Sequence, residues 1–273
     1  MRILHVMRQA FDYTGIELHV YELSCEQLRL GHQVSVVAPI QGGDLRLRML
    51  RAGLVVMQPA QALVEFKPEL LHLHNAQVTP AEVTERVPTV ATLHDAWDSV
   101  SRGKVRRWIV VRSDLERFVP SGAICIPNGF DLTRFYPRPL PETEMPRVLC
   151  IGNFRDKRRR AMLEDLLSQA ERNEIALSLV GLGLARRVLR PGAAVFSMRW
   201  DIENLITLCT HTAGIYVGRT TIEGWLCSRP GWAYDENGRK DLLYPPGNTR
   251  DTYGIERVAQ QVMSVYEQVL AGA

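Results

Sequence analysis

The sequence predicts two α/β domains, each built around a doubly wound, mainly parallel β-sheet. Short runs of Val, Ile and Leu alternate along the chain with segments whose apolar residues recur at helical spacing. The runs are nearly continuous rather than interrupted by polar residues, which is typical of strands covered on both faces. A proline-rich stretch at 135–146 separates two such series, and a length of 273 residues accommodates two domains.

The first domain is predicted over residues 1–138 and begins with a strand–helix–strand unit. Residues 2–7 form an apolar run, residues 16–30 carry apolar side chains at helical spacing, and residues 33–39 form a second apolar run. Gly31 and Pro39 are placed to end the helix and the second strand. Four further strands are expected, with a short helix between the first two of them: 70–75, 88–95, 106–113 and 122–127.

The second domain is predicted over residues 139–252 and repeats the same alternation. Residues 158–172 have helical periodicity, and the expected strands are 147–153, 175–181, 213–218 and 231–235. The final segment, 253–273, reads as an amphipathic helix, because its apolar residues between 254 and 270 recur at helical spacing. We expect this helix to pack back toward the first domain.

Composition narrows the functional class. The formal net charge is only +3, with 46% hydrophobic and 23% charged residues, which excludes a disordered chain and a strongly cationic nucleic-acid coat protein. The N-terminal residues lack a signal-peptide pattern, and no apolar run approaches the ~20 residues of a membrane helix. The five cysteines are scattered without a C-x-x-C pair, so we expect reduced thiols, no structural zinc and a cytoplasmic protein.

Ligands of doubly wound sheets bind outside the carboxyl ends of the strands, so residues there are the candidates for function. Gly15 precedes the first helix, where backbone N–H groups could hold a phosphate, although a glycine needed only for a turn explains it equally well. Gly181 and Gly183 follow a strand, but Arg186 occupies the third glycine position of G-x-G-x-x-G. A nicotinamide-binding domain is therefore only weakly supported.

Histidines also lie near predicted strand ends. His94 and Asp95 close a strand, so His94 could hydrogen-bond a substrate or act as an acid or base. A packed histidine beside a capping aspartate is the alternative. His72 and His74 share one face of another strand, but two ligands do not make a metal site, and we predict none.

Charged residues follow two strands of the second domain. The segment RDKRRR (155–160) holds five basic residues and one acidic residue; it is either a solvated run or a means of neutralising a diphosphate. Glu223 is expected to open a helix after the loop GRTTI (218–222). It could stabilise that helix start or accept hydrogen bonds from the two hydroxyls of a ribose.

Six segments in a fixed order resemble the group 1 (family four) retaining glycosyltransferases of the GT-B fold, in a compact form. They are Gly15-Ile16-Glu17 with LGHQVSVVAP, PTVATLHD, IPNGFDLTRFYP (126–137), VLCIGNFRDKR, SLVGLG and EGWLCSRPG (223–231). The resemblance implies two Rossmann-like domains facing a central cleft, and transfer of a sugar with retention from a nucleotide-diphosphate sugar, UDP- or GDP-linked. It implies no cofactor and no metal.

The resemblance also implies roles for individual residues. His94 would contact the donor sugar, while Lys157, with Arg155 or Arg158, would neutralise the departing diphosphate. The donor would further be bound by residues from both domains: Gly15, Gly183, Thr220, Thr221 and Glu223.

The sequence departs from the family pattern in three ways. The family has two glutamates with seven residues between them, but the position that precedes Glu223 at this spacing is Ile215. Asn153 stands where the family often has an arginine, and the chain is short. A catalytically silent nucleotide-sugar-binding protein and a nucleotide-sugar epimerase or hydrolase of the same fold are therefore the alternatives to a transferase.

The acceptor is expected at the first domain. Phe11, Tyr13 and Trp97 offer flat apolar surface for a sugar or a base. The stretch Arg102–Arg112, which also contains Lys104, Arg106 and Arg107, could bind a phosphate-bearing acceptor, although a solvated basic helix explains it equally well. A glycan, a lipid-linked sugar at a membrane surface and hydroxymethylated DNA are the candidate acceptors.

Overall fold

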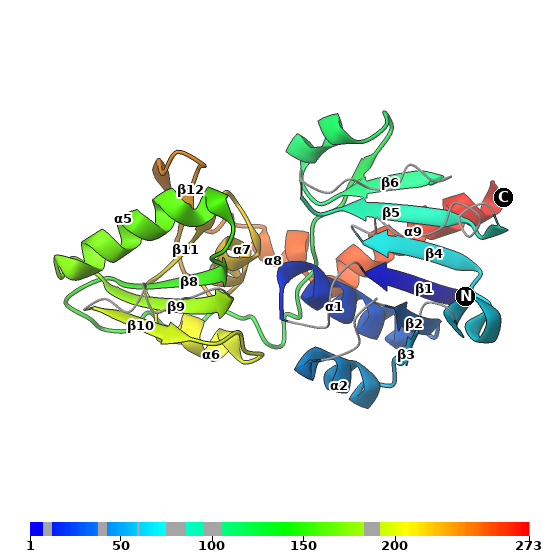
Figure 1. The fold of residues 1–273 in the computed structure, drawn as a ribbon, viewed down its shortest axis with the longest axis horizontal. Coiled ribbons are helices and arrows are strands. Elements are labelled where there is room, and N and C mark those ends of the chain that lie inside the picture. Colours follow the sequence, from blue (N-terminus) through cyan, green and yellow to red (C-terminus); the bar gives the residue numbers. More distant parts are fainter. Residues whose placement is uncertain are drawn as a thin grey trace. The chain divides into compact units, whose positions relative to one another are not determined.

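A computed structural model of the chain describes residues 1–7, 13–37, 43–58, 61–74, 86–95, 105–182 and 192–272. The chain divides into an N-terminal unit, Met1–Phe130 with Thr252–Ala273, and a C-terminal unit, Asp131–Asp251. The division falls ahead of the sequence-predicted boundary at 138/139. Both chain termini lie at one end of the N-terminal unit (Figure 1).

The N-terminal unit is built on a seven-stranded parallel sheet of order β3-β2-β1-β4-β5-β6-β7. The strands are β1 (Arg2–Met7), β2 (Gln33–Val37), β3 (Val55–Met57), β4 (Leu70–His74), β5 (Thr89–Leu93), β6 (Arg107–Val110) and β7 (Ile124–Cys125). The strands predicted from the apolar runs are confirmed, and β3 is an additional edge strand.

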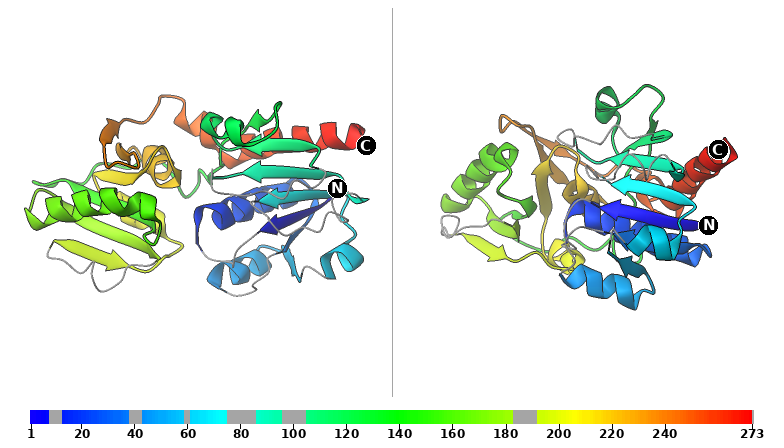
Figure 2. Two further views of the ribbon diagram at one scale, coloured as in Figure 1. Left: turned by 45° about the horizontal axis from the view of Figure 1, so that its top comes forward. Right: turned by 45° about the vertical axis from the view of Figure 1, so that its right-hand side comes forward.

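Helices α1 (Gly15–Arg29) and α9 (Ile255–Ala271) cover the same face of this sheet. Their apolar side chains share one core with residues of β1, β4 and β5, including Ile3, Leu23, Leu70, Val90, Val262 and Tyr266. Figure 2 shows α9, in red, running along the strands. The remaining helical segments are α2 (Asp44–Arg51), η1 (Ala62–Phe66) and η2 (Ser113–Phe118). The helix predicted between residues 75 and 88 lies mostly outside the described residues.

The Asn128-Gly129 turn has a packing role. The Phe130 N–H donates to the Tyr253 carbonyl at 2.8 Å, and the Ile255 N–H donates to the Phe130 carbonyl at 2.9 Å. A Cβ atom on Gly129 would lie 2.6 Å from Ile255 Cδ1, so only glycine lets α9 approach this closely. The turn therefore docks the C-terminal helix onto the N-terminal unit.

The C-terminal unit is built on a six-stranded sheet of order β10-β9-β8-β11-β12-β13, in which only β13 runs antiparallel to its neighbour. The strands are β8 (Arg147–Asn153), β9 (Ala176–Leu182), β10 (Ala193–Phe196), β11 (His211–Ile215), β12 (Gly231–Tyr234) and β13 (Lys240–Leu243). Apolar residues of helix α5 (Arg160–Glu171), which follows the short turn η3 (Lys157–Arg159), pack on β8 and β9. The other helices are α6 (Ile202–Thr207), α7 (Arg219–Leu226) and α8 (Thr249–Tyr253).

The proline-rich segment is held against the C-terminal unit rather than free. The fully buried Arg229 guanidinium donates hydrogen bonds to the Arg138 carbonyl at 2.8 Å and the Pro139 carbonyl at 2.6 Å. It also donates to the carbonyls of Cys227 and Thr207. Four carbonyl acceptors compensate this cation for its lost hydration. No helix among the described residues combines the length and apolar character needed to cross a membrane.

Candidate functional site

The C-terminal sheet has a topological switch point between β8 and β11. The chain leaves β8 toward β9 on one side and leaves β11 toward β12 on the other. Ligands of doubly wound sheets bind at such points, outside the carboxyl ends of the strands. The segments that follow the two strands, 154–159 and 216–221, therefore define the candidate site.

Helix α7 presents its N-terminus at the switch point. Its cap is Gly218, which supplies no side chain to satisfy the first backbone N–H groups. Both threonines of the first turn are buried, and their hydroxyls donate to carbonyls at 3.3 Å: Thr220 to Ile151, and Thr221 to Tyr216. The backbone N–H groups and the positive end of the helix dipole are thus the parts of this turn that could bind an anion.

The expectation that Glu223 opens a helix is wrong. Helix α7 begins at Arg219, so residues 219–222, predicted as a loop, form its first turn, and Glu223 lies in the second. The Glu223 carboxylate is buried and accepts a hydrogen bond from Arg219 Nε at 2.7 Å. Burial raises the pKa of the Glu223 carboxyl, and the positive charge of Arg219 opposes that rise.

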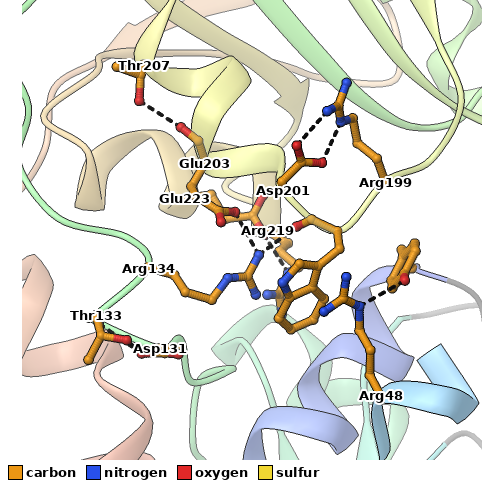
Figure 3. A network of polar contacts seen from close by, with 12 residues as sticks. Arg48, Asp131, Thr133, Arg134, Arg199, Asp201, Glu203, Thr207, Arg219 and Glu223 are labelled. Carbon is orange, nitrogen blue, oxygen red and sulfur yellow. Dashed lines mark hydrogen bonds and ion pairs between the residues drawn. The ribbon is translucent and has the colours of Figure 1, made fainter. Parts of the chain in front are cut away.

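A second ion pair adjoins Glu223. Arg134 donates to Glu203 Oε2 and to the Trp200 carbonyl, both at 2.7 Å, and its guanidinium lies 3.7 Å above the centre of the Trp200 ring. Its charge also lowers the pKa of Glu223. Two guanidinium and two carboxylate groups therefore form one network with balanced charge (Figure 3).

Sequence reasoning missed this network apart from Glu223. Arg134 stands in the segment IPNGFDLTRFYP, which carried part of the family resemblance, so its position was a usable signal. Glu203 and Trp200 come from a stretch with no motif, and only the fold brings them beside Arg134.

The basic run 155–160 divides into paired and exposed cations. Arg158 forms an ion pair with Asp156 at 2.6 Å, and Arg159 donates to the Ile151 carbonyl at 3.2 Å. Arg155, Lys157 and Arg160 are exposed. Arg155 and Lys157 precede α5 and are the exposed cations nearest along the chain to the end of β8, so they are the candidates to meet a diphosphate at the switch point.

Two family positions have structural explanations. Asn153, where the family often has an arginine, accepts the Arg155 N–H at 3.1 Å and shapes the turn after β8. Gly181, from the segment SLVGLG, pairs with Gly152, and a Cβ atom there would lie 1.9 Å from the Gly152 carbonyl oxygen. Gly181 is thus required for close strand packing. Gly183 and Arg186 lie outside the described residues.

In the N-terminal unit, Gly15 is the first residue of α1, as expected for a helix N-terminus. The Thr14 hydroxyl, at the cap position, donates to the buried Glu17 carboxylate. This carboxylate lies in the first turn, where it already complements the helix dipole. The phosphate contact suggested for Gly15 remains a prediction.

His94 follows β5 and is 8% exposed. Its Nε2 lies 3.1 Å from His74 Nδ1, and the Asn128 side chain hydrogen-bonds the same ring. Burial lowers the pKa of His94 to about 3, so the imidazole is neutral at pH 7. It could accept or donate one hydrogen bond to a ligand, but it carries no charge.

The candidate acceptor residues are only partly described. Phe11, Trp97, Arg102 and Lys104 lie outside the described residues, while the Tyr13 hydroxyl accepts a hydrogen bond from Arg48 Nε at 3.1 Å. The rest of the basic stretch does not form a helix, because strand β6 occupies 107–110. Arg107 stands at the amino end of β6, and Arg112, beyond its carboxyl end, pairs with Asp114 at 2.9 Å. The described cations therefore lie at opposite ends of a strand and do not form a helical patch.

One protein-family model matches the N-terminal part of the chain. Residues 13–128 match the model described as Glycosyltransferase Family 4. No curated protein sequence matches the chain.

Solved structures resemble the chain over nearly its whole length. HepE (Alr3699) of Anabaena, in complex with UDP and glucose, is 16% identical with a TM-score of 0.78, over 98% of this chain and 99% of that protein. WaaG, a glycosyltransferase involved in lipopolysaccharide biosynthesis, is 13% identical with a TM-score of 0.63, over 98% and 90%. An α-glucosyltransferase in complex with UDP and a 13-mer DNA containing an HMU base is 11% identical with a TM-score of 0.62, over 99% and 93%.

At identities this low, the structural similarity shows the fold and no more. The predicted pair of Rossmann-like sheets is confirmed. The chain has the GT-B fold of glycosyltransferases, and its residues 13–128 are similar to Glycosyltransferase Family 4.

Proposed function

We propose that this protein transfers a hexose from a nucleoside-diphosphate sugar to an acceptor hydroxyl, with retention of the anomeric configuration and without a metal ion. One observation supports the proposal above all. The switch point of the C-terminal sheet combines the N-terminus of α7 with the exposed cations Arg155 and Lys157. Helix N-termini and unpaired basic side chains are what a diphosphate requires.

In the proposed reaction the bond between the anomeric carbon and the diphosphate oxygen breaks as the acceptor oxygen bonds to the same face of the sugar. The proton of the acceptor hydroxyl passes to the departing phosphate oxygen. Lys157 and Arg155, aided by the α7 dipole, stabilise the negative charge that grows on the leaving group. Because the charge is largest in the transition state, these groups act mainly on the rate.

Glu223 would accept hydrogen bonds from the two ribose hydroxyls. Its ion pair with Arg219 fixes the orientation of the carboxylate, and the neighbouring Arg134 favours its ionised form. The hydroxyls of Thr220 and Thr221 already donate to carbonyls. Their part in phosphate binding would therefore be to hold the α7 turn so that its backbone N–H groups point at the ligand. Gly183 and Arg158 are further candidates for donor contacts.

His94 would contact the donor sugar as a neutral imidazole, and Gly15 would approach the phosphate. UDP is the first nucleotide to test, because HepE was solved with UDP and glucose, and GDP is the second. The acceptor class stays open among a glycan, a lipid-linked sugar and a modified DNA base. The lipopolysaccharide and DNA enzymes resemble the chain equally well, with TM-scores of 0.63 and 0.62.

A catalytically silent nucleotide-sugar-binding protein is the second candidate. It is favoured by Ile215, which lies in strand β11 at the position of the family's first glutamate. A nucleotide-sugar epimerase or hydrolase is a further alternative, and turnover with and without an acceptor separates these activities.

A thermal-shift panel of UDP-, GDP-, ADP- and dTDP-sugars tests the proposal. A ligand at 100 times its dissociation constant should stabilise the protein by roughly 2.7 kcal/mol. We expect one nucleotide class to shift the melting temperature, and a smaller shift in Glu223→Gln. The matched control is Glu174→Gln, whose side chain is exposed. The absence of a shift with every nucleotide would contradict a functional donor site.

A further inference from the structure

Five imidazoles gather on one face of the N-terminal sheet. They come from β1 (His5), β4 (His72 and His74), the end of β5 (His94) and helix α1 (His19), and each is at most 8% exposed. Strand register places His5 beside His72 and His74 beside Thr92. Figure 1 shows the three contributing strands side by side. Sequence reasoning considered the pair on β4 and His94 separately, and the fold brings these three together with His5 and His19.

A directional chain of hydrogen bonds runs through three of these rings. The Gln27 carbonyl oxygen lies 2.7 Å from His5 Nε2, His5 Nδ1 lies 2.9 Å from His74 Nε2, and His74 Nδ1 lies 3.1 Å from His94 Nε2. A neutral imidazole has one N–H and one lone pair. Because the Gln27 oxygen only accepts, His5 donates from Nε2 and accepts at Nδ1 from His74. His74 therefore directs the lone pair of its Nδ1 toward His94.

The ligand atoms that this cluster offers are imidazole nitrogens. Neutral imidazole nitrogens are the common ligands of Zn²⁺, Co²⁺, Ni²⁺ and Cu²⁺, whereas Mg²⁺ and Ca²⁺ prefer oxygen.

We propose that His19, His74 and His94 form a binding site for a divalent transition metal of the zinc class. One ligand nitrogen from each ring lies within 4.8 Å of the other two. Tetrahedral coordination at about 2.0–2.1 Å from Zn²⁺ to nitrogen requires ligand nitrogens about 3.3 Å apart. His74 Nδ1 and His94 Nε2 are already 3.1 Å apart, so ligation requires mainly that the His19 ring move closer to them. The ion occupies the place of the proton shared by His74 Nδ1 and His94 Nε2.

The surroundings of these rings suit metal ligation. A histidine ligand usually donates its other ring N–H to an acceptor, which fixes the tautomer and the ring plane. His74 donates Nε2–H to His5, which Gln27 orients in turn. The protein therefore supplies a chain of outer partners for His74.

A second group of three, His5, His72 and His74, suits an ion less well. Both nitrogens of His72 are engaged, Nδ1 with the Tyr266 hydroxyl and Nε2 with the Thr92 hydroxyl at 2.6 Å. Binding there would break these bonds as well as the one between His5 and His74. In the first group the ion replaces the contact between His74 and His94, and His94 is its most exposed member.

The site is independent of the proposed sugar transfer, which needs no metal. Among the described residues, no cysteine or carboxylate joins the three imidazoles. Three protein ligands leave a coordination position for water. An ion between His74 and His94 would occupy His94 Nε2, which already contacts His74, and would leave His94 Nδ1 unligated.

Titration of the chelator-treated full chain with Co²⁺ tests the site without reference to activity. We expect one ion per chain, with the intense visible absorption of four-coordinate cobalt and no thiolate-to-cobalt charge-transfer band, and displacement by Zn²⁺. His19→Gln should weaken binding at least about tenfold, and His94→Gln should do the same. His32→Gln, which alters a histidine of the same unit outside the cluster, should bind like the wild type.

Several outcomes would overturn the proposal. One is the absence of cobalt absorption up to millimolar concentrations, and another is a charge-transfer band, which would place the ion on cysteines. Unchanged affinity in both His19→Gln and His94→Gln would also contradict the assignment. His19 lies outside the hydrogen-bonded chain, so its variant retains that chain if the His94 variant fails to fold. A Zn²⁺-dependent rise in melting temperature that is lost in His19→Gln would support the site independently.

Discussion

The two sheets share the strand order of a Rossmann domain, yet they carry opposite polar chemistry near their carboxyl ends. The N-terminal sheet buries neutral imidazoles that are bonded to one another. The C-terminal unit places paired guanidinium and carboxylate groups beside its switch point, with two exposed cations nearby. Both groups of side chains depend on long-range packing, but they respond to different conditions. Protonation disrupts the buried imidazoles, and loss of a partner charge disrupts the guanidinium–carboxylate pairs.

Acid should produce the largest difference between the two units. Burial lowers the pKa of His5 to about 4 and that of His94 to about 3, against about 6.5 in the unfolded chain. Stability that depends on these neutral rings is complete above pH 6.5 and is lost as the pH falls toward 4. Each such ring should cost about 2–3 kcal/mol between pH 6.5 and 4.5.

In thermal melts of chelator-treated protein, the melting temperature of the N-terminal unit should therefore fall more than that of the C-terminal unit as the pH is lowered from 6.5 to 4.5. His5→Gln should flatten the pH dependence, and His32→Gln should leave it close to that of the wild type. Equal losses in both units would contradict the contrast between imidazoles and ion pairs.

The C-terminal network should respond to a single substitution at neutral pH. Arg134→Met removes the partner of the largely buried Glu203 and leaves two carboxylates close to one guanidinium. We expect a loss of about 3 kcal/mol in the free energy of unfolding of this unit, measured by urea denaturation. Arg172→Met breaks the exposed pair with Glu174 and should leave the free energy of unfolding nearly unchanged. Similar losses in both variants would show that the network adds no stability.

The two sites differ in how well the sequence revealed them. Residues 155–160 and Glu223 stand in local motifs, so they were identified as candidates, although the start of α7 was misplaced. The segment Gly218-Arg219-Thr220-Thr221 looks like a turn because glycine and β-branched residues disfavour helix interiors. His72, His74 and His94 were identified from the sequence but not as one cluster, because they and His5 come from different strands whose register only the fold determines.

The fold itself was predictable where its strands are long and apolar. The predicted strands 147–153 and 175–181 correspond to β8 and β9, whose apolar residues are largely buried. The short strands Val55–Met57 and Lys240–Leu243 lie at sheet edges. The first has only three residues and the second begins with Lys240 and Asp241, so neither shows the long apolar run of a buried strand. The gathering of Arg134, Trp200 and Glu203 depends on tertiary packing and has no local sequence signal.

Lys157→Ala should affect the C-terminal site without affecting its stability. The side chain is exposed, so its loss should leave unfolding unchanged but slow sugar transfer by about 100-fold, with a smaller effect on donor affinity. Steady-state kinetics with the donor found in the nucleotide panel checks this. Arg51→Ala, at an exposed position of α2, is the matched control. Equal losses in rate and affinity would mean that Lys157 stabilises only the bound donor.

Glu223→Ala should weaken nucleotide binding by about 1–3 kcal/mol through the loss of ribose hydrogen bonds. Calorimetric titration with the nucleoside diphosphate measures this effect, and the 2′-deoxy nucleotide provides a matched ligand. We expect the wild type to prefer the ribose form and the variant to bind both forms equally. Unchanged affinity in the variant would refute this role.

The most direct test of the central claim compares UDP with uridine in calorimetric titrations. An anion site at the switch point predicts that UDP binds at least about tenfold more tightly than uridine. This difference should largely disappear when Arg155 and Lys157 are both replaced by alanine, while uridine binding stays unchanged. Equal binding of UDP and uridine by the wild type, or an undiminished preference in the double variant, would contradict a diphosphate site at these residues.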